Sequence, residues 1–177
     1  MSLKKLDYLS RSQLQRIHRL GGDRNARRVI QNMSHYLCSF REGENIYYLN
    51  QEGRERVSSK KVRKKTLQAR HFLMRNDVYI AYNQPATWKN EVRIKAGDDL
   101  VLIADAMFER SGRYYFVEVD HTQKMNQNRS KIEKYKKIKQ NNDFTLIWIT
   151  LTEYRRKQLI SLCEGLDAQV HTINDFK

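Results

Sequence analysis

The sequence predicts an α/β protein, α+β overall, with two domains in its 177 residues. Three observations lead to this fold class. Helical patterns and one hairpin pattern fill the first third, helical patterns then alternate with strand patterns, and the basic run "SSKKVRKK" separates the two parts. We therefore predict an N-terminal domain over residues 1–58, a basic linker over 59–65 and a second domain over 66–177.

The first long helix is indicated by "SRSQ", which follows a short helical segment. Ser10 and Gln13 have the spacing of a capping box. An apolar repeat at helical spacing follows, made of Leu14, Ile17 and Leu20. We expect Gly21 and Gly22 to end this helix, because glycine accepts the positive φ of a helix C-cap.

A second helix is predicted over residues 24–40, with Asp23 as its cap. Its apolar stripe is expected to be Ala26, Ile30, Met33 and Leu37. The next segment, residues 40–57, has the pattern of a β-hairpin with Gly43 in its turn, followed by a short helical turn after Gly53. Helices followed by a hairpin are typical of a winged helix-turn-helix, in which the second long helix enters the major groove of DNA.

The polar face of this second helix carries side chains that bind DNA. Arginine suits phosphate or guanine, and glutamine and asparagine suit adenine. With the wing and the basic linker, the predicted DNA-binding residues are Arg24, Arg27, Arg28, Gln31, Asn32, Arg41, Lys60, Lys61, Arg63 and Lys64. A merely solvated arginine-rich face is the alternative that the sequence leaves open.

The charge balance favours a polyanionic partner. The chain has 34 Lys+Arg against 20 Asp+Glu, and residues 1–65 hold 16 and 6 of them. No apolar run is long enough to span a bilayer, which argues against a membrane role. Cys38 and Cys163 lie far apart in helix-like contexts, so we expect reduced thiols in the bacterial cytoplasm and no zinc site.

The second domain is predicted as an α/β sandwich with a mixed sheet. A helix over residues 66–83 precedes three strands in a meander, with Gly112 in the second turn. The strands and helices expected are 91–95, 99–109 and 113–120, then helix 128–140, strand 144–151, helix 153–166 and strand 168–175.

Carboxylates gather at the predicted ends of these strands. Glu91 opens the first strand, and Asp105 and Glu118 end the second and third, so the three should converge. Such oxygen ligands suit Mg²⁺ or Mn²⁺, with Asp105 and Glu118 as the candidate metal ligands. The order of these acids resembles the PD-(D/E)xK nuclease fold, that of restriction endonucleases.

That nuclease pattern normally has a lysine two residues after its last acid. Asp120 stands there instead, and we expect it to be an accessory acid or the partner of a helix lysine. Lys131 is the lysine that could take over the catalytic position, with Lys124 second. The predicted catalytic set is therefore Glu91, Asp105, Glu118 and Lys131.

Over most of residues 6–150 the chain resembles the replication-relaxation family of plasmids and other mobile elements. The motifs that carry the resemblance are "YYLNQEGRERV", "RHFLMRNDVYIAY", "DLVLIADAMFE", "RYYFVEVDHTQ" and "KIEKY". The resemblance implies a winged helix joined to a restriction-endonuclease-like domain. It also implies a DNA-binding accessory in the replication, relaxation or transfer of bacterial mobile DNA, and the family tolerates an acid at the position of Asp120.

Three functions stay open at this point. The first is a binder of double-stranded DNA that needs no cofactor and has a relaxase or replication initiator as a further partner. The second is a nuclease or nickase dependent on Mg²⁺ or Mn²⁺. The third is a transcriptional repressor of its own operon. A homodimer that reads two half-sites fits all three.

Overall fold

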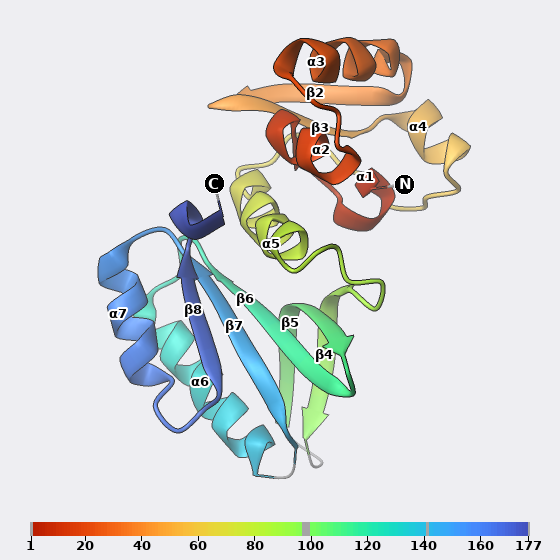
Figure 1. The fold of residues 1–177 in the computed structure, drawn as a ribbon. Helices are drawn as coiled ribbons and strands as arrows, with labels where there is room; N and C mark the ends of the chain where they lie inside the picture. The colour runs from red at the N-terminus through yellow and green to blue at the C-terminus, as the bar shows by residue number, and fades with distance from the viewer. Residues whose placement is uncertain (1, 97–99, 141, 177) are drawn as a thin grey trace. The chain divides into compact units, whose positions relative to one another are not determined.

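The computed structural model describes residues 2–96, 100–140 and 142–176. Asp99, the first residue of a predicted strand, lies outside these ranges. The chain forms two compact units, Met1–Asn76 and Asp77–Lys177 (Figure 1). The first contains helices and a small antiparallel sheet and the second a five-stranded mixed sheet with helices, which confirms the α+β class.

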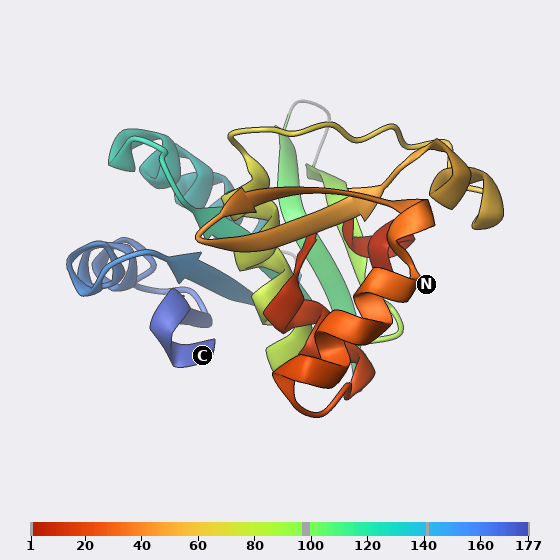
Figure 2. The same cartoon turned by 90° about the horizontal axis from the view of Figure 1, so that it is seen from above.

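The N-terminal unit begins with helices and ends with a hairpin and a short helix. Its elements are α1 (Ser2–Leu6), β1 (Leu9–Ser10), α2 (Arg11–His18), α3 (Asp23–Asn32), the 3-10 helix η1 (Ser34–Tyr36), β2 (Leu37–Glu42), β3 (Glu44–Leu49) and α4 (Gln51–Arg56). The strands pair antiparallel in the order β1-β3-β2, and β2 and β3 lie side by side in both views (Figure 1, Figure 2). Leu6, Leu9, Ala26 and Ile46 are fully buried in this unit.

The capping box at the start of α2 is confirmed. The Ser10 side chain accepts from the Gln13 backbone N–H, and the Gln13 side chain accepts from that of Ser10. The expected end of this helix is wrong, because Arg19 rather than Gly21 is the left-handed C-cap, with φ 51°. Gly22, not Asp23, is the N-cap of α3, and the carboxylate of Asp23 is bound to Arg11.

The second helix is shorter than predicted. It ends at Asn32, because Leu37–Glu42 pairs with β3 and forms the first strand of the hairpin. Of the predicted apolar stripe, Ala26 and Ile30 are buried on α3, whereas Met33 is 47% exposed. Pairing between strands therefore determines the conformation of residues 37–40, which also places Cys38 in a strand. The turn of the hairpin contains Gly43, with φ 74°, as predicted.

The basic segment 59–65 has no helix or strand and contacts the N-terminal unit. Asp7 is only 2% exposed and binds Arg63, Arg75 and, more distantly, Lys61. The Asn76 amide donates to the carbonyl oxygens of Leu6 and Tyr8. These bonds tie the first part of α5 (Ala69–Ala81) to the N-terminal unit, so the division between units falls inside α5.

The C-terminal unit has the element order expected from the sequence. After α5 come β4 (Lys89–Ala96), β5 (Leu100–Arg110), β6 (Arg113–Asp120), α6 (Met125–Lys139), β7 (Phe144–Thr150), α7 (Glu153–Leu162), β8 (Ala168–Thr172) and η2 (Ile173–Phe176). The strand order is β4-β5-β6-β7-β8. The pairs β4–β5 and β5–β6 are antiparallel, and the pairs β6–β7 and β7–β8 are parallel.

Helices α6 and α7 pack on the sheet through one apolar cluster (Figure 1). The cluster joins Ile132 and Tyr135 of α6 and Leu159 of α7 to Phe116 and Trp148 of the strands. All seven residues of β7 are buried, which explains the apolar run over residues 146–149. The cluster forms the core beneath the edge of the sheet where the predicted acids lie.

Strand β5 changes face near Asp105. Leu102 and Ala104 belong to the α6–α7 cluster, and Met107 also packs against it. Strict alternation would place Leu102 and Met107 on opposite faces, so the alternation shifts by one residue between them. The β4–β5 pairing skips Asp105 and the opposite residue, Glu91, which has a positive φ of 53°.

Candidate nucleic-acid interface and carboxylate cluster

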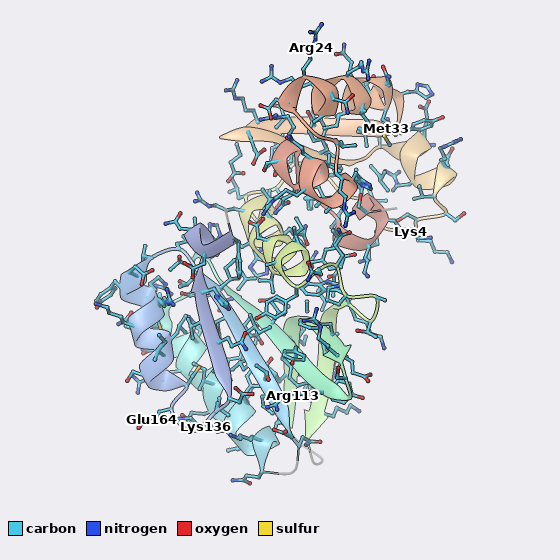
Figure 3. All side chains as sticks on the ribbon, viewed as in Figure 1. Lys4, Arg24, Met33, Arg113, Lys136 and Glu164 are labelled. Carbon is cyan, nitrogen blue, oxygen red and sulfur yellow. The ribbon has the colours of Figure 1, made fainter. Side chains whose placement is uncertain are left out.

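The polar face of α3 is one exposed surface. Its predicted DNA-binding residues line a single shallow hollow together with Asp23: Arg24, Arg27, Arg28, Gln31 and Asn32. All five are exposed, because the opposite side of α3 buries Ala26 and Ile30. Figure 3 shows Arg24 projecting away from the helix. The structure therefore brings this predicted set together on one helix face.

Neighbouring groups orient and neutralise parts of this face. The guanidinium of Arg28 donates to Asn25 Oδ1 at 2.9 Å, and the Asn25 amide donates to the Leu20 carbonyl at 2.8 Å. The one acid at the hollow, Asp23, lies 2.8 Å from Arg11. The hydrogen bond from Arg11 lowers the pKa of Asp23, so the one carboxylate at the hollow is already paired with a cation from α2.

The predicted basic residues outside α3 divide into two groups. Arg41, Lys60, Lys61 and Lys64 are exposed. Arg63 is half-buried and donates to Asp7 Oδ1 through Nε at 3.1 Å and Nη2 at 2.8 Å. Arg63 thus neutralises a buried acid, a contact that the sequence argument did not include.

The carboxylate cluster of the second unit is centred on Glu118. This side chain is 1% exposed and accepts from Lys131 Nζ at 2.5 Å and from the Tyr135 hydroxyl at 2.6 Å. Burial raises the pKa of Glu118 to about 8, and the charge of Asp105 acts in the same direction, whereas Lys131 and Tyr135 oppose it. The structure therefore brings together three of the predicted catalytic residues, Asp105, Glu118 and Lys131. The sequence argument missed Tyr135 as a partner, although its position four residues after Lys131 puts both on one side of α6.

Asp105 lies inside β5 and not at its end as predicted. Its Oδ2 accepts from the Val119 backbone N–H at 2.8 Å, just beyond the last regular β5–β6 pair, Ala106 with Val117. The carboxylate thus accepts a hydrogen bond from a backbone N–H of β6, in place of a strand carbonyl. Glu91 stands opposite Asp105 in the register, but its side chain is exposed.

Asp120 is not the partner of a helix lysine, and its role as an accessory acid stays a prediction. It is fully buried, and its partner is Arg155 of α7 rather than a lysine, with further hydrogen bonds from Asn128 and Thr150. Burial acts to raise the pKa of Asp120, but the hydrogen bonds from Arg155, Thr150 and Asn128 outweigh it and lower the pKa. Lys124, the second lysine considered, is exposed at the N-cap of α6.

Arg155 could have been found from the sequence order. It lies in the first turn of the helix that follows β7, and β7 is parallel to β6. The start of α7 therefore lies at the same edge of the sheet as Asp120, the last residue of β6.

As arranged, these donors do not fit a divalent cation. Within residues 2–96, 100–140 and 142–176, no group of three or more His, Cys, Asp or Glu could hold a metal ion. The ammonium of Lys131 takes one oxygen of Glu118, and Arg155 takes both oxygens of Asp120. The catalytic and metal-binding roles stay predictions, and we derive no step through a metal.

Comparisons with known proteins identify the family. The family model described as "Replication-relaxation" matches residues 1–146. One similar solved structure is protein VC1899 from Vibrio cholerae, with 12% identity and a TM-score of 0.45. The match covers 88% of this chain and 41% of that one, so the chain spans less than half the length of that protein. No curated protein matches the chain.

No helix in the described part of the chain is long and apolar enough to cross a membrane. The family match extends from the first unit through β6, α6 and the start of β7, and so includes both the α3 face and the carboxylate cluster. It supports a role in the replication or relaxation of plasmid or mobile-element DNA. The chain belongs to the replication-relaxation family.

Proposed function

We propose that the protein is a DNA-binding accessory of plasmid or mobile-element replication, relaxation or transfer. In this proposal the N-terminal unit is a winged helix-turn-helix that binds double-stranded DNA without a cofactor. The observation that carries the proposal is the α3 face, where Arg24, Arg27, Arg28, Gln31 and Asn32 share one exposed hollow.

The chemistry of this face suits a DNA groove. Arginine can donate two hydrogen bonds to guanine or bind phosphate, and the amides of Gln31 and Asn32 can pair with adenine. The β2–β3 hairpin would serve as the wing, with Arg41 exposed near its tip. Lys60 and Lys64 would add phosphate contacts, whereas Arg63 and, more distantly, Lys61 are bound to Asp7.

Two features argue for DNA over a merely solvated face. The excess of 34 Lys+Arg over 20 Asp+Glu raises the local concentration of any polyanion. The hollow also combines arginine with amide side chains, a set that recognises bases as well as phosphate. A relaxase or replication initiator as second partner, and autoregulation as a repressor, are compatible with this binding.

The test measures binding to a labelled DNA duplex by fluorescence anisotropy over a salt series. Affinity should fall steeply between about 50 and 200 mM salt, because each neutralised phosphate releases counterions. Replacing a phosphate-binding arginine should reduce the slope of log affinity against log salt by about 1. Arg27→Ala and Arg28→Ala are the test variants.

The matched control is Arg70→Ala, which removes an equal charge from an exposed site on α5. If Arg27→Ala and Arg28→Ala bind as tightly as the unchanged protein, α3 is not the recognition helix. Loss of affinity in all three variants alike would mean that only net charge matters.

A second candidate is metal-dependent cleavage, suggested by the proximity of Asp105, Glu118 and Lys131, and it requires that Lys131 release Glu118 to a metal ion. Supercoiled, linear and single-stranded DNA would be incubated with the protein and Mn²⁺ or EDTA. Asp105→Asn is the control, because asparagine keeps an oxygen for the Val119 N–H. Metal-dependent nicking that this variant lacks would establish a nuclease, and intact DNA with salt-sensitive binding would favour the accessory.

A further inference from the structure

The two edges of the five-stranded sheet differ in charge. On β4, alternate positions carry exposed charged side chains, namely Lys89, Glu91, Arg93 and Lys95, and the backbone is distorted at Glu91. Charges and distortions of this kind prevent an edge strand from pairing with another chain. Strand β8, at the other edge, has the sequence AQVHT and no Lys, Arg, Asp or Glu.

The parallel ladder shows which backbone groups of β8 face outward. Leu146 N–H donates to the Asp167 carbonyl at 2.8 Å, and Leu146 pairs with Ala168. In a parallel pair, alternate residues direct both backbone groups toward the neighbour, so Gln169 faces β7 and Ala168 and Val170 face outward. Among the described residues, none forms a hydrogen bond with the outward backbone N–H and C=O groups of Ala168 and Val170. The outward N–H of Thr172 is taken by Asp175 at 2.9 Å.

An apolar hollow lies beside this open edge. It is formed between α7 and β8 by Ile160, Ser161, Cys163, Glu164, Leu166, Ala168 and Val170. Ile160 is 53% exposed. An open strand next to an apolar hollow is the combination that takes up an added strand, with backbone bonds supplying affinity and the hollow taking side chains.

The charge of this region indicates which molecule could supply the added strand. Residues 158–176 contain no Lys or Arg and three acids, Glu164, Asp167 and Asp175, in a chain of net charge +14. Arg113 and Arg156 contact this segment, but they are paired with its acids Asp167 and Asp175, so the basic charge beside it is compensated. The segment is therefore a place where two copies can meet without opposing positive charges.

We propose that a second copy of this chain pairs its β8 with β8 in antiparallel orientation, about a two-fold axis through Gln169. This register joins Ala168 of each strand to Val170 of the other, so that all the open backbone groups are used. Centring on Ala168 or on Val170 would use only half of them. The axis is perpendicular to the sheet, so both copies of α7 lie on one face and their Ile160 side chains approach each other.

The test is sedimentation equilibrium without DNA, which keeps it separate from the proposed DNA binding. The unchanged chain should show a concentration-dependent mass approaching twice 21.2 kDa. Gln169→Lys should weaken the dimer by about fivefold, because it places like charges directly opposite across the axis. Gln169→Glu should do the same, and mixing the two variants should restore dimerisation.

The matched control is Arg93→Glu at the β4 edge, which should leave the dimer unchanged. Because Gln169 contacts Tyr82, urea unfolding of each variant should first show that the monomer is folded. A monomer at every concentration overturns the proposal, as does a dimer that is insensitive to Gln169→Lys. Failure of the mixed variants to restore the dimer overturns the two-fold register. A dimer that does not bind DNA would support this interface while contradicting the proposed function.

Discussion

Arg155 Nε and Nη2 each donate to one oxygen of Asp120 at 2.6 Å, which joins the last residue of β6 to the first turn of α7. Arg155 also donates to the Gln123 carbonyl at 2.8 Å, so it holds the loop that leads to α6 as well. Asp120 thus has a structural partner in Arg155. It anchors the edge of the sheet beside Glu118.

Arg155→Ala should destabilise the protein by about 3–5 kcal/mol. The substitution leaves the fully buried carboxylate of Asp120 without its cation, and an uncompensated buried charge is costly. The free energy of unfolding, measured in urea at neutral pH, checks this expectation.

Arg156→Ala is the matched control one residue along the helix. Arg156 is paired with half-exposed or exposed acids, Glu153 and Asp175, so its loss should cost under about 1 kcal/mol. Equal effects of the two substitutions would show that the Asp120 pair adds nothing specific.

Glu118 should make stability fall with rising pH. Its folded pKa of about 8 exceeds the ordinary value of 4.5, so between these values the folded state holds a proton that the unfolded state releases. The contribution to stability is complete below about pH 4.5 and is lost as the pH rises through 8, by at most about 1.4 kcal/mol per pH unit.

Glu118→Gln removes this titration while keeping an oxygen for the Tyr135 hydroxyl. The variant should gain stability relative to the unchanged protein as the pH rises from 5 to 8, as measured by urea unfolding at each pH. A difference between the two proteins that stays constant over this range would contradict the expectation.

Gly53→Ala should destabilise the N-terminal unit by about 1–3 kcal/mol. A Cβ at this position would lie 2.1 Å from the Tyr36 carbonyl oxygen, which is backbone and cannot rotate away. Gly22→Ala is the control: a Cβ there meets nothing within 4 Å, so only the smaller cost of alanine at the N-cap of α3, under about 1 kcal/mol, is expected. Thermal unfolding of both variants checks this expectation. Equal melting temperatures would mean that the backbone around residue 53 shifts at little cost.

Ser10→Ala should cost about 1 kcal/mol of stability. Ser10 is 2% exposed, and its hydroxyl accepts from the Gln13 N–H at 3.2 Å at the start of α2. Ser10→Thr retains the acceptor and should recover most of the loss in urea unfolding. If threonine is no better than alanine, packing rather than capping explains the effect.

The sequence by itself determined the fold class and most element types. Apolar patterns predicted the order of helices and strands in the second unit. The apolar run of β7 is typical of a strand that is buried on both faces, and the spacing of Ile132, Tyr135 and Ile138 places them on one helix face. Local chemistry also determined the capping box at Ser10 and the turn at Gly43. The polar face of α3 could be predicted from the sequence, because helical spacing alone places its arginines on one side of the helix.

Only the tertiary structure shows where contacts between distant segments override the local preference of the chain for a helix or for a regular strand. Residues 37–40 have a helical pattern but form a strand, because pairing with β3 satisfies their backbone groups. Asp105 lies inside a strand whose faces switch there, which no strict alternation predicts. The partners of Asp7 and Asp120 come from distant parts of the chain. A buried carboxylate selects its cation through burial and geometry in three dimensions, and spacing along the chain does not encode that choice.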